Sequence, residues 1–114
     1  MRRMTIISKE YVLRLIQTSA KGDAALEHFV SRALGLDPAQ IKDSTVDIEA
    51  ARTFVQTLLP TWMVGIEGGR DRVSCRLTDA ETGHFTLLEA ATEPLALIGA
   101  AIAALSYRDL SRVA

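Results

Sequence analysis

Hydrophobic residues change their spacing at Pro60, and this change constrains the fold more than any other feature of the sequence. Before Pro60 the apolar residues recur every three or four positions, as along one face of a helix. After it they alternate with other residues over two short runs, as in strands with one buried face. The pattern predicts an α+β fold with helices packed on a small antiparallel sheet of two or three strands, in the order α-α-α-β-β-(β)-α.

The first two expected helices are marked by capping residues. Ser8 is a good N-cap, and Lys21-Gly22 is a typical helix end. Asp23 caps a second helix, which Gly35 ends. The apolar residues of this second helix form one stripe, made of Leu26, Phe29, Val30, Ala33 and Leu34.

A third helix is expected after a connection that runs from Asp37-Pro38 to about Thr45. It begins near Asp47 and stops at Pro60, because proline cannot continue a helix. The apolar residues on one side of it are Ile48, Ala51, Phe54, Val55, Leu58 and Leu59.

The two alternating runs predict a β-hairpin with one solvent-exposed face. Residues 61–67 and 72–78 are joined by Gly68-Gly69-Arg70-Asp71, a glycine-rich turn. Residues 84–89 form either a third strand, with Phe85 and Leu87 facing inward, or the approach to the next helix. The sequence leaves these two alternatives open.

The last helix is expected from Thr92 or Glu93 to about Arg108, with Pro94 in its first turn. From Leu95 to Leu105 it is apolar on every side and rich in alanine. A helix of this kind must be buried on two sides. One side is expected on the sheet, and the other meets either the N-terminal helices or a second copy of the chain. The second alternative predicts a homodimer through residues 95–105.

Length and charge exclude several classes of protein. The 114 residues fit a single domain spanning 1–114, and 13 basic against 14 acidic residues give a net charge of −1. This balance lacks the basic excess of general nucleic-acid binding proteins. A single cysteine cannot form an internal disulfide, and the uncharged run at residues 95–107 is too short to span a bilayer. We therefore expect a cytoplasmic protein without a membrane segment.

Catalytic and cofactor chemistry lack a recognisable residue set. Cys75 is expected on the inward face of the second strand, where a free cysteine behaves as a small hydrophobic residue. His28 is expected to face solvent and His84 to begin the third strand, so neither completes a metal site. Gly68 and Gly69 lead into a strand and not into a helix, unlike a phosphate-binding loop. We expect no catalytic, metal or cofactor-binding residues, and hence no enzyme.

Three arginines are the candidate partner-binding residues. Arg72 and Arg76 are expected on the outer face of the second strand, and Arg70 lies in the turn before it. Guanidinium groups placed in this way bind phosphates or an acidic partner. The alternative is an ordinary solvated surface opposite Glu67.

Several segments resemble one family. These segments are Gly22 to Glu27 closing on Ala33-Leu34-Gly35, Asp47 to Leu59, Leu59-Pro60-Thr61-Trp62 entering the first strand, the hairpin, and Ala91 to Leu97 opening the last helix. In them the chain resembles small phage and prophage proteins of the phage ABA-sandwich domain type. The resemblance covers about residues 20–107. It implies a core at 22–107, with helices on the sheet. The N-terminal helix expected within residues 1–21 is extra to the family pattern.

The resemblance implies a phage or prophage setting and no established activity. The hypothesis that follows is a non-enzymatic protein-interaction protein, with an unidentified protein partner in a host or defence complex. The alternative is a nucleic-acid accessory module that uses the arginine-bearing face of the hairpin, whose binding would weaken steeply with salt.

Overall fold

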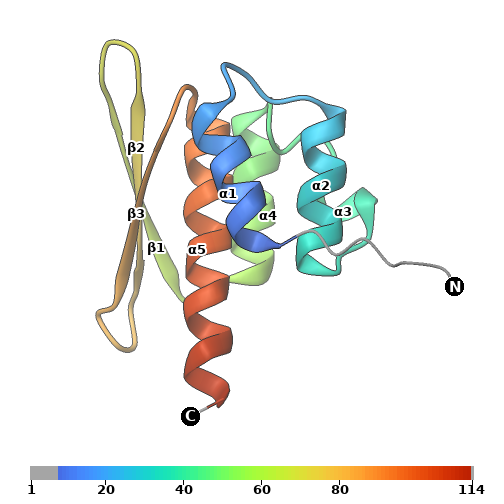
Figure 1. The fold of residues 1–114 in the computed structure, drawn as a ribbon. Helices are drawn as coiled ribbons and strands as arrows, with labels where there is room; N and C mark the ends of the chain where they lie inside the picture. Colours follow the sequence, from blue (N-terminus) through green and yellow to red (C-terminus); the bar gives the residue numbers. More distant parts are fainter. Residues whose placement is uncertain (1–7, 114) are drawn as a thin grey trace, which may run out of the picture.

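Five helices and a three-stranded antiparallel sheet follow one another along residues 8–113, the part of the chain that the computed structural model describes, with side chains to residue 108 (Figure 1). The elements are α1 (Lys9–Thr18), α2 (Ala24–Leu34), α3 (Pro38–Ile41), α4 (Ile48–Leu58), β1 (Trp62–Gly68), β2 (Val73–Asp79), β3 (Phe85–Ala90) and α5 (Glu93–Val113). The predicted α+β class and the order of elements are confirmed. The one addition is α3, a single turn inside the predicted connection.

Side-chain caps fix most helix ends where the sequence predicts them. The Asp23 carboxylate accepts a hydrogen bond from the Leu26 N–H at 2.8 Å, and Gly35 ends α2 in the left-handed conformation. The prediction was wrong at the end of α1, which stops at Thr18 and not at Lys21-Gly22. There the hydroxyl of Ser19 donates a hydrogen bond to the Leu15 carbonyl at 2.6 Å. This bond satisfies the carbonyl at the point where the backbone leaves the helix and becomes extended.

A buried carboxylate joins α2 to the segment before α4. Glu27 accepts hydrogen bonds from the Asp43 N–H at 3.0 Å, the Thr45 N–H at 3.3 Å and the Thr45 hydroxyl at 2.6 Å. Asp43 has a φ of 65°, which is uncommon for a residue other than glycine. Gly22 lies against Thr45 so closely that a Cβ would overlap it. These contacts hold α3 and the segment before α4 against α2.

The sheet has the order β1-β2-β3, with Ile66 paired to Cys75 and Cys75 to Leu88. The strand alternative for residues 84–89 is therefore the one that forms. The expected orientation of Phe85 and Leu87 was wrong, since both are exposed and the buried residues of β3 are Leu88 and Ala90. The cause is the register: Leu88 lies beside buried Cys75, so its neighbours must face the other way.

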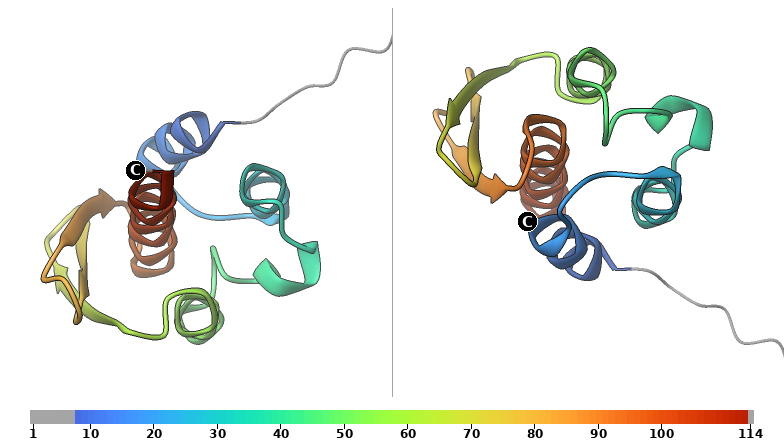
Figure 2. Two further views of the ribbon diagram at one scale, coloured as in Figure 1. Left: turned by 90° about the horizontal axis from the view of Figure 1, so that it is seen from below. Right: turned by 90° about the horizontal axis from the view of Figure 1, so that it is seen from above.

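All helices lie on one side of the sheet, and α5 is the central one (Figure 2). One side of α5 packs on β2 and β3, and α1 and α4 cover its other sides. Within residues 95–105 only Ala103 is partly exposed, so the structure buries this segment inside one chain. Of the two arrangements that the sequence left open for it, the internal one is present.

Helix α5 continues to Val113, beyond the predicted end near Arg108. Arg108 itself closes the end of α4, because its Nη1 donates a hydrogen bond to the Leu58 carbonyl at 3.1 Å. Although α5 is long, no helix within residues 8–113 combines the length and apolar character needed to cross a membrane.

Candidate functional site

No described helix covers the face of the sheet turned away from the helices (Figures 1 and 2), and apolar side chains are exposed on it. Met63 on β1 is 60% exposed, and Phe85 and Leu87 on β3 are 50% and 56% exposed. Apolar groups gathered in this way on a surface commonly mark an interaction site. We call this surface the outer sheet face; the strand registers assign to it Met63, Gly65, Glu67, Ser74, Arg76, Thr78, Phe85, Leu87 and Glu89.

A shallow groove of about 430 Å³ crosses the middle of the outer sheet face. Its floor is open because Gly65, which is paired with Arg76, has no side chain. The guanidinium of Arg76 lies 4.7 Å from the centre of the Phe85 ring and so leans towards β3. A Cβ at Gly65 would meet only the Arg76 carbonyl, at an ordinary 3.9 Å. Packing within the chain therefore does not require a glycine here, and its absent side chain leaves room for a ligand group.

Charge divides the outer sheet face along the strands. Ser74 is paired with Glu67 on one side and with Glu89 on the other, so two carboxylates lie near the turn between β1 and β2. The exposed apolar residues lie towards the other end, and Arg76 stands between the two regions. An amphipathic surface of this kind suits a partner that offers apolar contacts together with hydrogen-bonding groups.

The three predicted arginines do not form one group. Arg72 donates hydrogen bonds from Nη2 to the Gln17 carbonyl at 3.2 Å and to the Glu89 carbonyl at 3.1 Å, and its Nε lies 3.6 Å from Glu89 Oε2. It therefore ties the end of α1 to β3. Arg70 lies exposed in the turn, and Arg76 lies on the outer sheet face. Only Arg76 belongs to the groove.

The cysteine and the histidines have structural surroundings. Cys75 is fully buried, and desolvation raises the pKa of its thiol to about 11, with Arg52 opposing the shift. The ring of His84 stacks on Tyr107 with 3.4 Å between centroids, while His28 is exposed, as expected. In the part of the chain that is described, no three His, Cys, Asp or Glu side chains are grouped to hold a metal ion.

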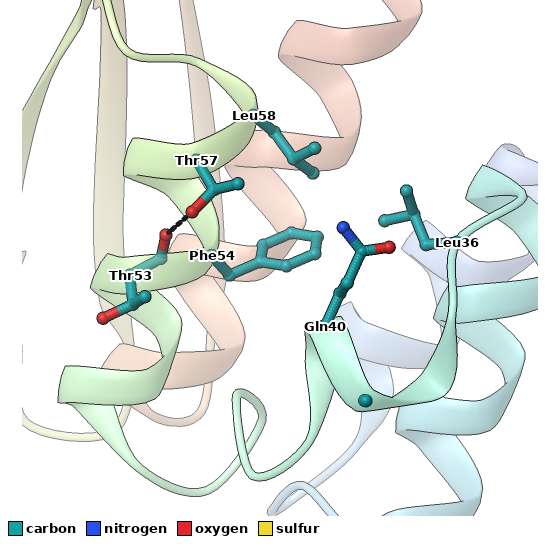
Figure 3. A pocket seen from close by; sticks show the side chains of 7 residues that line it. Leu36, Gln40, Thr53, Phe54, Thr57 and Leu58 are labelled. Carbon is teal, nitrogen blue, oxygen red and sulfur yellow. Dashed lines mark hydrogen bonds between the residues drawn. The ribbon is translucent and has the colours of Figure 1, made fainter.

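A second concave site lies between α3 and α4. Phe54 and Leu58 of α4 face Leu36 and Gln40 across a cleft of about 240 Å³ (Figure 3). Its polar groups serve their own helices: the Thr57 hydroxyl donates to the Thr53 carbonyl at 2.8 Å, and Gln40 completes the cap of α3. The cleft offers apolar contact and lacks a convergent set of reactive groups.

The sequence pattern predicted a solvent-exposed face for the hairpin, but it missed that Phe85 and Leu87 of β3 lie on that face. The signal was the pair Leu87-Leu88, because two adjacent apolar residues in a strand must point to opposite faces. Comparison with known proteins adds no site: no family model, curated protein or solved structure matches the chain. Membership of the phage ABA-sandwich family therefore stays a prediction.

Proposed function

We propose that this chain is a non-enzymatic protein-interaction protein that binds its partner on the outer sheet face. The observation that carries the proposal is the exposure of Met63, Phe85 and Leu87 on a sheet face that no described helix covers. Burying a fully exposed large apolar side chain is worth about 1.5–3 kcal/mol, and these three, exposed by 50–60%, each keep roughly half of that free energy to be gained. A partner that covers them recovers this free energy.

The groove indicates the chemistry of the partner surface. An apolar side chain fits over Gly65 and against Leu87, and a carbonyl or carboxylate oxygen placed above it meets the guanidinium of Arg76. The carboxylates of Glu67 and Glu89 favour donors at the other end. The resemblance to phage ABA-sandwich proteins supports a phage or prophage setting, in which the chain would occupy a host or defence complex.

The test compares two apolar residues of equal exposure in captures from the native host. Leu87 on the outer sheet face and Val46 before α4 are both 56% exposed. Leu87→Gln is expected to reduce the recovered partner at least about tenfold, as expected for a central contact residue, whereas Val46→Gln leaves it unchanged. Equal recovery with both variants would contradict the proposal, and so would the absence of any partner above background.

A nucleic-acid accessory module is the second candidate, favoured by one observation. Arg76 stacked over exposed Phe85 is an arrangement on which a base can stack. Two carboxylates on the same face and the engagement of Arg72 by α1 and β3 weigh against it. It predicts binding that weakens steeply with salt and is lost in an Arg70→Ala, Arg76→Ala double variant.

A further inference from the structure

Strand β1 is an edge strand whose outward backbone groups are unpaired. The turn bond from the Gly69 N–H to the Arg72 carbonyl and the bond from the Ala80 N–H to the Thr61 carbonyl lie at opposite ends of the β1–β2 ladder. Antiparallel pairing alternates along this ladder, so Met63, Gly65 and Glu67 direct their backbone groups to β2. Those of Val64 and Ile66 point away from the sheet, and no group in residues 8–108 pairs with them.

The other edge of the sheet is protected at the Glu89 end of β3, and β1 has no such cover within the described residues. On β3 the guanidinium of Arg72 takes the Glu89 carbonyl, and α1 lies alongside. None of the seven residues of β1 is buried, and even Val64, whose side chain faces the helices, is 36% exposed. Helix α5 packs mainly on β2 and β3, which leaves β1 extending beyond it.

The composition of β1 lacks the usual protection against pairing. Edge strands are normally guarded by lysine, proline or a bulge. In β1 the only charged residue is Glu67, near one end, and all seven residues pair with β2 without interruption. An exposed, regular and nearly uncharged edge is a template for another strand.

We propose that a second copy of this chain binds here, with the two β1 strands paired antiparallel about a two-fold axis at Gly65. Gly65 is the middle residue of Trp62–Gly68, so this register overlaps the strands completely. It places Val64 opposite Ile66 of the second copy, and their free N–H and C=O groups then bond in both directions. Each Glu67 lies opposite Met63 of the other copy, so the two carboxylates stay at opposite ends.

The register two residues further along, centred on Ile66, is less favourable. It brings the two Glu67 carboxylates onto neighbouring positions of the same face, where like charges repel. The register centred on Val64 uses the Trp62 N–H, which already donates to the Leu59 carbonyl at 3.1 Å. Pairing about Gly65 keeps the two carboxylates apart and calls on the Trp62 N–H only at its terminal pair, Trp62 with Gly68 of the second copy. It also joins two outer sheet faces into one six-stranded surface. The pairing of the two β1 strands does not depend on what that surface binds.

Cysteine cross-linking tests this register. In the proposed dimer the two Gly65 Cα atoms are about 4.5 Å apart, as in a non-hydrogen-bonded pair, which suits a disulfide. The two Met63 residues are about 14 Å apart along the strands, which does not. Under mild oxidation Gly65→Cys is expected to form a covalent dimer and Met63→Cys to remain monomeric. Native Cys75 is fully buried and does not compete.

The association itself is measured by sedimentation equilibrium of the full chain. The wild type is expected to approach twice its monomer mass of 12.4 kDa as concentration rises. Val64→Pro removes an outward N–H without touching the β1–β2 ladder and is expected to raise the dimer Kd at least about tenfold. Val64→Lys repeats the test if the proline variant is unfolded by circular dichroism, and Leu87→Gln, remote from the edge, keeps the wild-type Kd.

The proposal is overturned by a wild type that stays monomeric at high concentration, by Met63→Cys cross-linking as readily as Gly65→Cys, or by a folded Val64 variant with an unchanged Kd. A monomer that instead binds a foreign extended segment along β1 would also overturn it. Leu87→Gln separates this proposal from partner binding on the outer sheet face. If Leu87→Gln loses the captured partner but still forms the dimer, this result supports both the dimer and partner binding on the outer sheet face.

Discussion

Removing the carboxylate of Glu27 is expected to destabilise the fold by about 3 kcal/mol. Three donors converge on this side chain, and hydrogen bonds to a charged group are worth about 1.5–3 kcal/mol each. The sum is an upper bound, because water reaches the half-exposed Asp43 N–H and because the variant no longer buries a charge. Glu27→Ala leaves the Thr45 N–H and hydroxyl unpaired. Glu27→Gln keeps one carbonyl acceptor and should lose about half as much.

The assay is urea unfolding followed by circular dichroism, with free energies of unfolding obtained by linear extrapolation. Glu49 is the matched control, since it also lies in the first turn of an eleven-residue helix but is exposed. Its replacement by alanine removes only a helix-dipole interaction, worth about 0.5 kcal/mol. If Glu27→Ala lowers the free energy of unfolding no more than Glu49→Ala does, then the three hydrogen bonds to the Glu27 carboxylate do not stabilise the fold as proposed.

Three further predictions concern single residues. Cys75 should react with a thiol reagent at pH 8 only after unfolding. Because its folded pKa of about 11 exceeds the usual 9.0, the stability that it contributes is full below about pH 9 and falls by about 2 kcal/mol as the pH rises to 11. Cys75→Ala should not show this loss in the same titration. Gly99→Val should destabilise the fold by about 2–3 kcal/mol in urea unfolding, because a Cβ there overlaps Leu88 and lies 3.2 Å from the Ile16 side chain. Arg72→Ala should cost about 1 kcal/mol by the same measurement through its lost carbonyl contacts, whereas Arg70→Ala should change stability by less than about 0.5 kcal/mol.

Local signals in the sequence determine most of the elements. The caps at Asp23 and Asp47, the stop at Pro60 and the alternation after it each act within a few residues, so they could be recognised from the sequence alone. The sequence pattern did not predict the turn of α3, although its cap, formed by Asp37 and Gln40, is also a local signal. Its four residues span a single helical turn, too short for the apolar repeat that marks a helix to be seen.

The candidate site depends on contacts between distant segments, which the sequence does not display. The outward direction of Phe85 and Leu87 follows from the register of β3 against β2, and an apolar run such as Leu87-Leu88 fits either orientation. The contact of Arg72 with Gln17 joins residues 55 positions apart. Glu27 is similar, since nothing near it in the chain indicates that Thr45 will cover it.

Photocross-linking in the native host shows most clearly whether partner proteins bind on the outer sheet face. A photoreactive residue replaces either Leu87 or Val46, which are equally exposed but lie on different surfaces of the molecule. Position 87 is expected to give a covalent product with a partner protein, and position 46 is expected to give none. Products from position 46 alone, or equal yields from both positions, would contradict it.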